Sequence, residues 1–177
     1  MEVSGVGMLI LGPSGIGKSE SALDLVMRGH RLIADDMVVM RRTGDGSLEG
    51  RGADHSGAHM EIRGLGIINI KDLFGVASVL ESKNVELVVN LCEWEELRDC
   101  DRLGLDDEFC DLMGVRVPSL RIPVYHGRNM AVILEVAARN HLLKKGGCFT
   151  ARDFEEALTR RLAGEGTGQK PPPGEKA

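Results

Sequence analysis

The sequence is poor in aromatic residues, has no surplus of positive charge and lacks cysteine pairs of metal-binding or redox spacing. Aromatics make up 3% of the 177 residues, which disfavours the stacking platforms that bind single-stranded nucleic acid. The formal net charge of -5 argues against a broad basic face for duplex DNA. No two of the four cysteines have C-x-x-C spacing, which excludes the common zinc and thioredoxin-type patterns. We therefore expect no nucleic-acid partner.

Long apolar runs are also missing. No stretch approaches the roughly 18 apolar residues of a membrane-spanning helix, and no signal peptide is evident. We expect a cytoplasmic protein with reduced thiols and no membrane partner. The length fits a single domain, which we assign to residues 1–163. Residues 164–177, rich in Gly, Pro and charge, are predicted to be a disordered tail.

The strongest motif is GPSGIGKS at residues 12–19, which follows an apolar run and precedes a helical pattern. It fits the Walker A pattern G-x-x-x-x-G-K-S, in which loop amides and a helix N-terminus bind phosphate oxygens. Lys18 would neutralise the β- and γ-phosphates, and the Ser19 hydroxyl would bind Mg²⁺. The nucleotide-binding residues are then Gly12, Pro13, Ser14, Gly15, Ile16, Gly17, Lys18 and Ser19. The alternative is a glycine-rich turn that binds no ligand.

The hydrophobic pattern predicts alternating strands and helices. Strands are expected over residues 5–11, 31–40, 61–70, 85–91 and 115–124, the last being one or two strands around its prolines. Helices are expected over 19–28, 129–144 and 150–162, with a hairpin turn at 43–47 and a mobile loop at 50–60.

Two adjacent carboxylates, Asp35 and Asp36, interrupt the predicted strand 31–40. Carboxylates are costly to bury unless they are paired or bind a metal ion. One could lie near Mg²⁺ as a Walker-B-like acid, and the other could act as a general base toward an attacking hydroxyl. The alternative is a solvated turn between two strands.

Other charged residues have weaker local signals. Glu61 and Arg63 are two residues apart, either as a surface ion pair or as a metal ligand and a phosphate ligand. The local sequence around Arg102 is uninformative, and we interpret its side chain as solvated. Residues 123–128 precede the strongest predicted helix and could bind an anion. His55 and His59 are separated by glycine, which disfavours a helical metal pair, and Trp94 is interpreted as packing.

Together these segments resemble the catalytic domain of bacterial HPr kinase/phosphorylase. The matching stretches are GPSGIGKSE (12–20), HRLIADD (30–36), EIRGLGIINI (61–70), DRLG (101–104) and PVYHGRN followed by AVILEVAARN (123–140). The resemblance covers about residues 2 to 160. It implies an α/β P-loop kinase fold of the HPr kinase/phosphoenolpyruvate carboxykinase-like type, with a central mixed sheet and flanking helices.

The resemblance implies a bifunctional enzyme. The family phosphorylates a regulatory serine of HPr, the phosphocarrier of the sugar phosphotransferase system, with ATP or pyrophosphate and Mg²⁺. It also removes that phosphate by phosphorolysis, which yields pyrophosphate. Residue by residue, it implies Asp35 as the base, Ser19, Asp36 and Glu61 as metal ligands, and Lys18 and Arg102 as catalytic. The segment implied for dephosphorylation is Pro123, Val124, Tyr125, His126, Gly127 and Arg128, and Arg63 is expected to meet phosphate.

The family also carries a catalytic histidine a few residues before the position of Met1, and its long members have a further N-terminal domain. For a chain that starts at Met1 we expect an altered balance of the two activities. Family members are hexameric, so a homo-oligomer is expected, with HPr or a paralogue as the partner. Two competing hypotheses are a small-molecule kinase with the same loop and a non-catalytic nucleotide sensor.

Overall fold

The computed structural model describes residues 1–53, 58–94, 107–125 and 127–165 of the chain. The strands are β1 (Glu2–Val3), β2 (Val6–Leu11), β3 (Val38–Arg42), β4 (Leu48–Gly52), β5 (His59–Ile62), β6 (Gly66–Asn69), β7 (Ser82–Asn84), β8 (Leu87–Glu93), β9 (Glu108–Leu112) and β10 (Val115–Val124). The helices are α1 (Lys18–Met27), α2 (Ile70–Phe74), α3 (Met130–Lys145) and α4 (Thr150–Glu165), with a 3₁₀ turn at Val76–Ser78.

The central sheet has the strand order β1-β2-β8-β10-β9. Its inner strands β2, β8 and β10 are parallel, whereas β1 and β9 pair antiparallel at the two edges. This is the mixed sheet that the sequence analysis expected. The carboxyl ends of the three parallel strands lie along one edge, where ligands bind in open α/β sheets.

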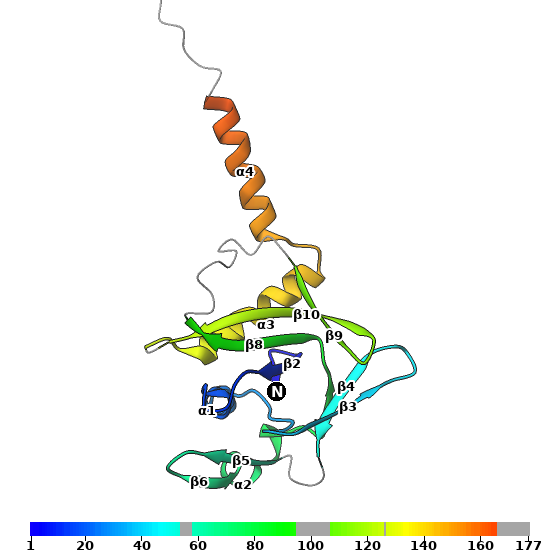
Figure 1. Ribbon diagram of the computed structural model, residues 1–177, viewed down its shortest axis with the longest axis vertical. Helices are drawn as coiled ribbons and strands as arrows, with labels where there is room; N and C mark the ends of the chain where they lie inside the picture. Colours follow the sequence, from blue (N-terminus) through cyan, green and yellow to red (C-terminus); the bar gives the residue numbers. More distant parts are fainter. Residues whose placement is uncertain (54–57, 95–106, 126, 166–177) are drawn as a thin grey trace, which may run out of the picture.

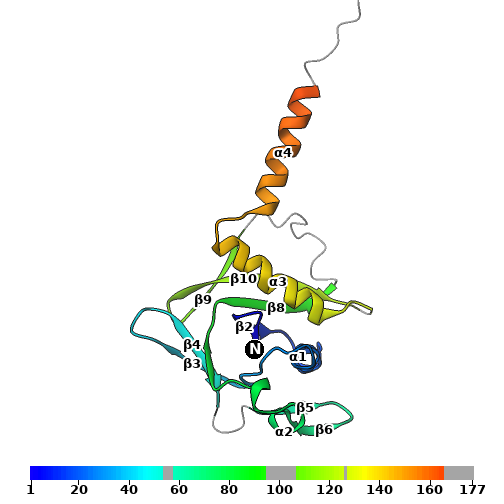
Figure 2. The same cartoon turned by 180° about the vertical axis from the view of Figure 1, so that it is seen from behind.

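Helices α1 and α3 cover one face of this sheet (Figures 1 and 2). The buried cluster between them joins the following residues: Val6, Met8, Leu25, Leu87, Val89, Leu91, Ile122, Met130, Ala131 and Leu134. The β3–β4 hairpin contributes to a second cluster, on the other face, around Leu9, Val88 and Val117. Helix α4 extends away from the rest of the chain (Figure 1). No helix in the described ranges is both long and apolar enough to cross a membrane. The α/β class with flanking helices is confirmed.

Helix α1 has a second packed side. Ala22 and Val26 lie in a separate buried cluster with Leu32, Met60 of β5 and Ile70 of α2. The helix therefore lies between the central sheet with α3 on one side and the small β5–β6 sheet on the other. Packing on both sides of α1 therefore helps to fix the residues at its N-terminus.

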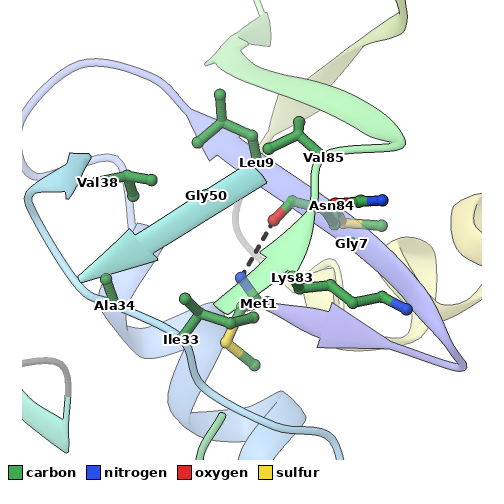
Figure 3. A pocket seen from close by; sticks show the side chains of 11 residues that line it. Met1, Gly7, Leu9, Ile33, Ala34, Val38, Gly50, Lys83, Asn84 and Val85 are labelled. Carbon is green, nitrogen blue, oxygen red and sulfur yellow. Dashed lines mark hydrogen bonds between the residues drawn. The ribbon is translucent and has the colours of Figure 1, made fainter. Parts of the chain in front are cut away.

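Close backbone packing joins the base of β2 to the β7–β8 connection. A β-carbon on Gly7 would lie 1.7 Å from the Asn84 carbonyl oxygen, so only glycine fits there. Figure 3 shows Gly7 beside Asn84 at a small cavity of about 30 Å³, lined also by Ile33 and Val38. That volume suits one or two waters and is too small for a nucleotide.

The predicted strand over 31–40 is wrong for most of its length. Leu32 makes an isolated bridge to Val79, and the chain then turns at 35–37 before β3 starts at Val38. The apolar residues Leu32 and Ile33 are buried in irregular structure. Leu32 packs against Ala22 and Val26 of α1, and Ile33 lines the small cavity near Gly7, so their apolar character reflects packing rather than a regular strand.

The segments 50–60 and 61–70 also differ from expectation. Residues up to Gly52 belong to β4, and β5 begins at His59, so the predicted mobile loop is largely strand where it is described. The single strand predicted over 61–70 is a hairpin of β5 and β6, and Ile70 starts α2. The hairpin turn at 43–47 is confirmed by the hydrogen bond from Thr43 N–H to the Ser47 carbonyl.

The second half of the chain follows the prediction more closely. Strand β8 and helix α3 lie where expected, and β10 is one continuous strand despite its two prolines. The short edge strand β9, rich in charge, was not predicted. Helix α4 begins at Thr150 as expected and continues to Glu165, two residues beyond the predicted end of the domain.

Candidate functional site

The loop between β2 and α1 is shaped by glycines in conformations that other residues rarely adopt. Gly12 has φ 152°, and a β-carbon there would lie 2.7 Å from the Leu91 carbonyl oxygen of β8. Gly17, with φ 97°, is the N-cap of α1 and makes no side-chain cap. The first N–H groups of α1 therefore stay available to an anion held by the loop.

Lys18 lies across this loop. Its Nζ donates to the Gly12 and Pro13 carbonyl oxygens, both at 2.9 Å. Both acceptors are backbone atoms of the loop itself, so the ammonium group is held over the loop. A bound polyphosphate would meet this charge directly.

The next residue, Ser19, brings the loop into contact with the paired carboxylates. Its hydroxyl donates to Asp35, with Oγ 3.1 Å from Oδ1 and 3.0 Å from Oδ2. Burial raises the pKa of the Asp35 carboxyl, and the neighbouring negative charge of Asp36 adds to this. Hydrogen bonds from Ser19 and from the backbone of Asp36 and Glu61 oppose the rise. The structure thus brings Asp35, Ser19 and the Glu61 backbone together.

Asp36 has a different environment from Asp35. It is exposed and has φ 48°, and the Met37 N–H bonds to the Asp35 carbonyl at 2.6 Å across it. This is a tight three-residue turn with a left-handed non-glycine residue at its centre, a conformation that costs of order 1–3 kcal/mol. The turn holds the two carboxylates in fixed and separate positions.

The β5–β6 hairpin adds a cation to the phosphate loop. Arg63 lies in its turn, and the Arg63 Nη2 atom is 3.5 Å from the place where a β-carbon of Gly15 would stand. The structure records no ion pair between Glu61 and Arg63, so the surface-pair alternative is not observed for these two described residues. The Arg63 guanidinium instead lies beside Gly15 of the loop.

Two more segments meet at the same edge of the sheet. The last parallel pair of β8 and β10 is Glu93 with Val124. The next residues, Trp94 and Tyr125, therefore lie next to each other just past the ends of the two strands. Their rings are 5.2 Å apart in an edge-to-face arrangement. Arg128 donates to the Pro123 carbonyl at 3.0 Å, and its guanidinium carbon lies 5.4 Å from the Tyr125 ring centre.

Some predicted site residues lie outside the described residues. These are Arg102 and His126; His55, which was disfavoured as a metal ligand, also lies outside the described residues. Gly127 is described and has φ 83°. Among the described residues, no group of three or more His, Cys, Asp or Glu side chains is arranged to hold a metal ion by itself.

The sequence analysis missed the aromatic pair. Trp94 was interpreted as packing, yet it is 55% exposed, and Tyr125 is 49% exposed. A signal was present, because the only Trp and the only Tyr of the chain each follow an apolar strand pattern directly. Parallel neighbouring strands bring such residues together, but the pairing of β8 with β10 was not evident from the sequence.

A larger hollow lies elsewhere. It has a volume of about 1070 Å³ and is lined by the first six residues of β10, by β9 and by the facing sides of α3 and α4. This is the amino end of β10, whereas the phosphate loop is at the carboxyl ends of the parallel strands. The hollow is thus separate from the site at residues 12–19.

The comparisons with known proteins identify the family of the chain. A family model described as the HPr Serine kinase C-terminal domain matches residues 1–158. The chain belongs to this family. Its HPr kinase/phosphorylase relatives include one from Geobacter sulfurreducens, 54% identical over 92% of this chain and 51% of the relative. Another, from Caldanaerobacter subterraneus subsp. tengcongensis, is 48% identical over 92% of this chain and 53% of the relative.

A solved structure of the same family has the same fold. The Hpr(Ser) kinase/phosphatase from Coxiella burnetii superposes with a TM-score of 0.78 at 31% identity, covering 89% of this chain and 93% of that chain. The chain spans about half the length of the curated HPr kinase/phosphorylase relatives reported above. The resemblance seen in the sequence is thereby confirmed at the level of family and fold.

Proposed function

We propose that this chain transfers a phosphoryl group from ATP or pyrophosphate to a regulatory serine of the phosphocarrier HPr or a paralogue. The same site would remove that phosphate by phosphorolysis, with inorganic phosphate attacking phosphoserine to release pyrophosphate. The observation that carries the proposal is the contact of Ser19 with Asp35, at 3.0–3.1 Å, next to a phosphate loop that has Arg63 beside its Gly15. Donor site and acid are thus adjacent.

The donor's phosphates would bind to the amides of residues 12–19 and to Lys18. In phosphoryl transfer, catalysis consists mainly of positioning and charge stabilisation. Two loop carbonyl oxygens already hold the Lys18 ammonium group over the loop. Arg63, in the turn of the β5–β6 hairpin, lies beside Gly15 of the same loop. Two cations would therefore face the transferred group, and Arg102 is proposed as a further one.

Mg²⁺ fits the oxygen donors present. It typically takes one or two carboxylates together with substrate phosphates and water, so it does not need a three-carboxylate cluster. Ser19 would be one ligand, and Asp36 and Glu61 are the proposed carboxylates, since the charge of Asp36 and the backbone of Glu61 both act on Asp35 beside Ser19. The ion would neutralise charge on the donor phosphates.

Asp35 is the proposed base. Its half-buried carboxylate contacts Ser19 next to the loop, where an attacking seryl hydroxyl must come close to the terminal phosphate. It would accept the seryl proton in the forward direction and return it in phosphorolysis. Residues 123–128 are proposed to serve the reverse reaction. We place the enzyme in the cytoplasm, where ATP is available, and propose a homohexamer.

Phosphoserine mapping in both directions tests the proposal. The protein is incubated with Mg²⁺ and ATP labelled in the γ-phosphate, together with HPr or HPr whose regulatory serine is changed to alanine. We expect label on HPr only when the serine is present, and none with Lys18→Ala. Adding phosphate should then release labelled pyrophosphate.

Other outcomes would contradict it. Label that appears only on small molecules would mean a metabolite kinase. Tight ATP binding without any transfer would mean a nucleotide sensor. Sedimentation velocity tests the hexamer separately, because a monomer with full transfer activity would remove only that part of the proposal.

A further inference from the structure

The only tryptophan and the only tyrosine of the chain touch each other just past the carboxyl ends of β8 and β10. Both are about half exposed, and neither belongs to a buried cluster. Aromatic rings are normally buried or placed where an exposed ring meets a partner. A pair of exposed rings at the ligand-binding edge of the sheet therefore calls for a ligand of matching chemistry.

The site has two sides, because α1 lies between two packed layers. Asp35 and Arg63 approach the loop from the β5–β6 side of α1. Trp94 and Tyr125 end the strands β8 and β10, which lie on the other side with α3 (Figures 1 and 2). A polyphosphate in the loop would thus have its two ends directed to different surroundings.

The chemistry of transfer decides which end is which. The attacking and leaving oxygens are roughly in line across the transferred phosphorus. The acceptor hydroxyl belongs next to the base Asp35, so the remainder of the donor extends away from Asp35. For ATP that remainder is the ribose and the base.

The spacing suits a nucleoside. The Leu91 carbonyl of β8 lies against Gly12, where the loop begins. Trp94 comes three residues later, about 10 Å further along at about 3.3 Å per residue. This is comparable with the reach of a ribose and a base from the phosphates of a bound nucleotide.

We propose that Trp94 and Tyr125 form the seat for the purine base of the donor. The inference rests on the proposed function and adds where the nucleoside binds. Arg128 keeps Tyr125 in place, since it packs over the ring and is itself bonded to the Pro123 carbonyl. Stacking on the exposed rings needs no base-specific hydrogen bond, because each purine has a π-face.

The test compares two ligands that share three phosphates. Binding of Mg-ATP and of Mg-tripolyphosphate is measured by calorimetry for the wild type, Tyr125→Ala and Trp94→Ala. We expect ATP to bind about tenfold more weakly to each variant, in the range found for loss of one stacked base. Tripolyphosphate affinity should stay unchanged. ATP, but not tripolyphosphate, should also quench the fluorescence of the wild type, which has a single tryptophan.

Phe109→Ala is the matched control. Phe109 is 46% exposed and has Arg116 over its ring at 4.2 Å, as Tyr125 has Arg128, but it lies on β9 away from the loop. This variant should bind both ligands like the wild type. Equal losses of ATP and tripolyphosphate in Tyr125→Ala would show a distorted loop and overturn the proposal, as would no loss of either.

Two further outcomes separate this proposal from the function on which it rests. If Tyr125→Ala raises the KM for HPr while ATP affinity is unchanged, the pair contacts the acceptor protein and the base seat is wrong. If Lys18→Ala binds ATP as well as the wild type does, the donor site itself is misplaced. That result would overturn the proposed function and the base seat together.

Discussion

Gly12→Ala should be among the most damaging single changes at the phosphate loop. The new β-carbon would lie 2.7 Å from the Leu91 carbonyl oxygen and 3.1 Å from Ile16 Cγ2. Leu91 cannot move aside cheaply, because β8 is paired on both sides by β2 and β10. The φ of 152° adds backbone strain for any residue with a β-carbon.

The magnitude follows from these two terms. Overpacking of this kind costs about 1–3 kcal/mol, and an unfavourable φ costs about 1–3 kcal/mol. Together they predict a loss of about 2–6 kcal/mol of unfolding free energy. For a domain of this size that corresponds to a fall in Tm on the order of 10 °C. If the strain is relieved by a shift of the loop, ATP affinity should fall as well.

Thermal unfolding and ATP calorimetry measure both consequences, with Gly44→Ala as the control. Gly44 lies in the 43–47 turn, has no neighbouring atom within 4 Å of its β-carbon position and no positive φ. Its Tm should stay near that of the wild type. A Gly12→Ala variant with wild-type Tm and wild-type ATP affinity would refute the reasoning, since it would mean that β2 and β8 are not in contact at this point.

Three other substitutions probe separate parts of the site and the fold. Lys18→Ala should weaken ATP binding about 10- to 100-fold, the range for losing one charged hydrogen-bond partner, and calorimetry with near-normal affinity would contradict this. Asp35→Asn should stop serine phosphorylation but spare ATP binding; if ATP affinity collapses while Asp36→Asn only slows transfer, the two aspartates have each other's roles. Partial burial opposes ionisation of Glu86, but hydrogen bonds from a backbone amide and a lysine outweigh it and lower its pKa below 4.5. The stabilising effect of the Glu86 carboxylate is therefore present above pH 4.5 and lost as the pH falls through the lowered pKa. Glu86→Gln should then reduce the Tm at neutral pH and hardly change it in acid. An equal reduction of the Tm at both pH values would contradict this.

The parts of the fold that the sequence predicted well are those set by local pattern. Helix α3 has a continuous apolar stripe, Asn129 as its N-cap and glycines at its end, and it lies where predicted. The phosphate loop was predictable because its glycines and Lys18 are required together by phosphate binding. The sequence predicted that the paired aspartates lie near the phosphate site, but it did not predict the hydrogen bond between Ser19 and Asp35.

The failures come from interactions between distant segments. The stretch at 31–34 was predicted as part of one strand because it is apolar, but it makes only isolated bridges, at Arg31 and Leu32, and Leu32 is buried against α1, Met60 and Ile70. Strand β9 has the polar character of an edge and pairs only with Val115–Ser119. No local sequence pattern predicts which strand such an edge strand pairs with. The aromatic pair was missed for the same reason, because only the parallel register of β8 and β10 brings it together.

The two loops proposed to serve the reaction are linked to each other by the helices that follow them. The phosphate loop precedes α1 and residues 123–128 precede α3, and the two helices pack together. His30, just after α1, is bound to Glu135 of α3 through its Nε2, 2.8 Å from Oε1. This contact links α1 to α3, whereas the proposed base Asp35 contacts Ser19 in the first turn of α1. If the proposed function and base seat are right, pyrophosphate would occupy only the loop, whereas ATP would also reach Trp94 and Tyr125. The preference between these donors would then be a property of the aromatic end of the site, and it could change without any change in the residues proposed to perform the transfer.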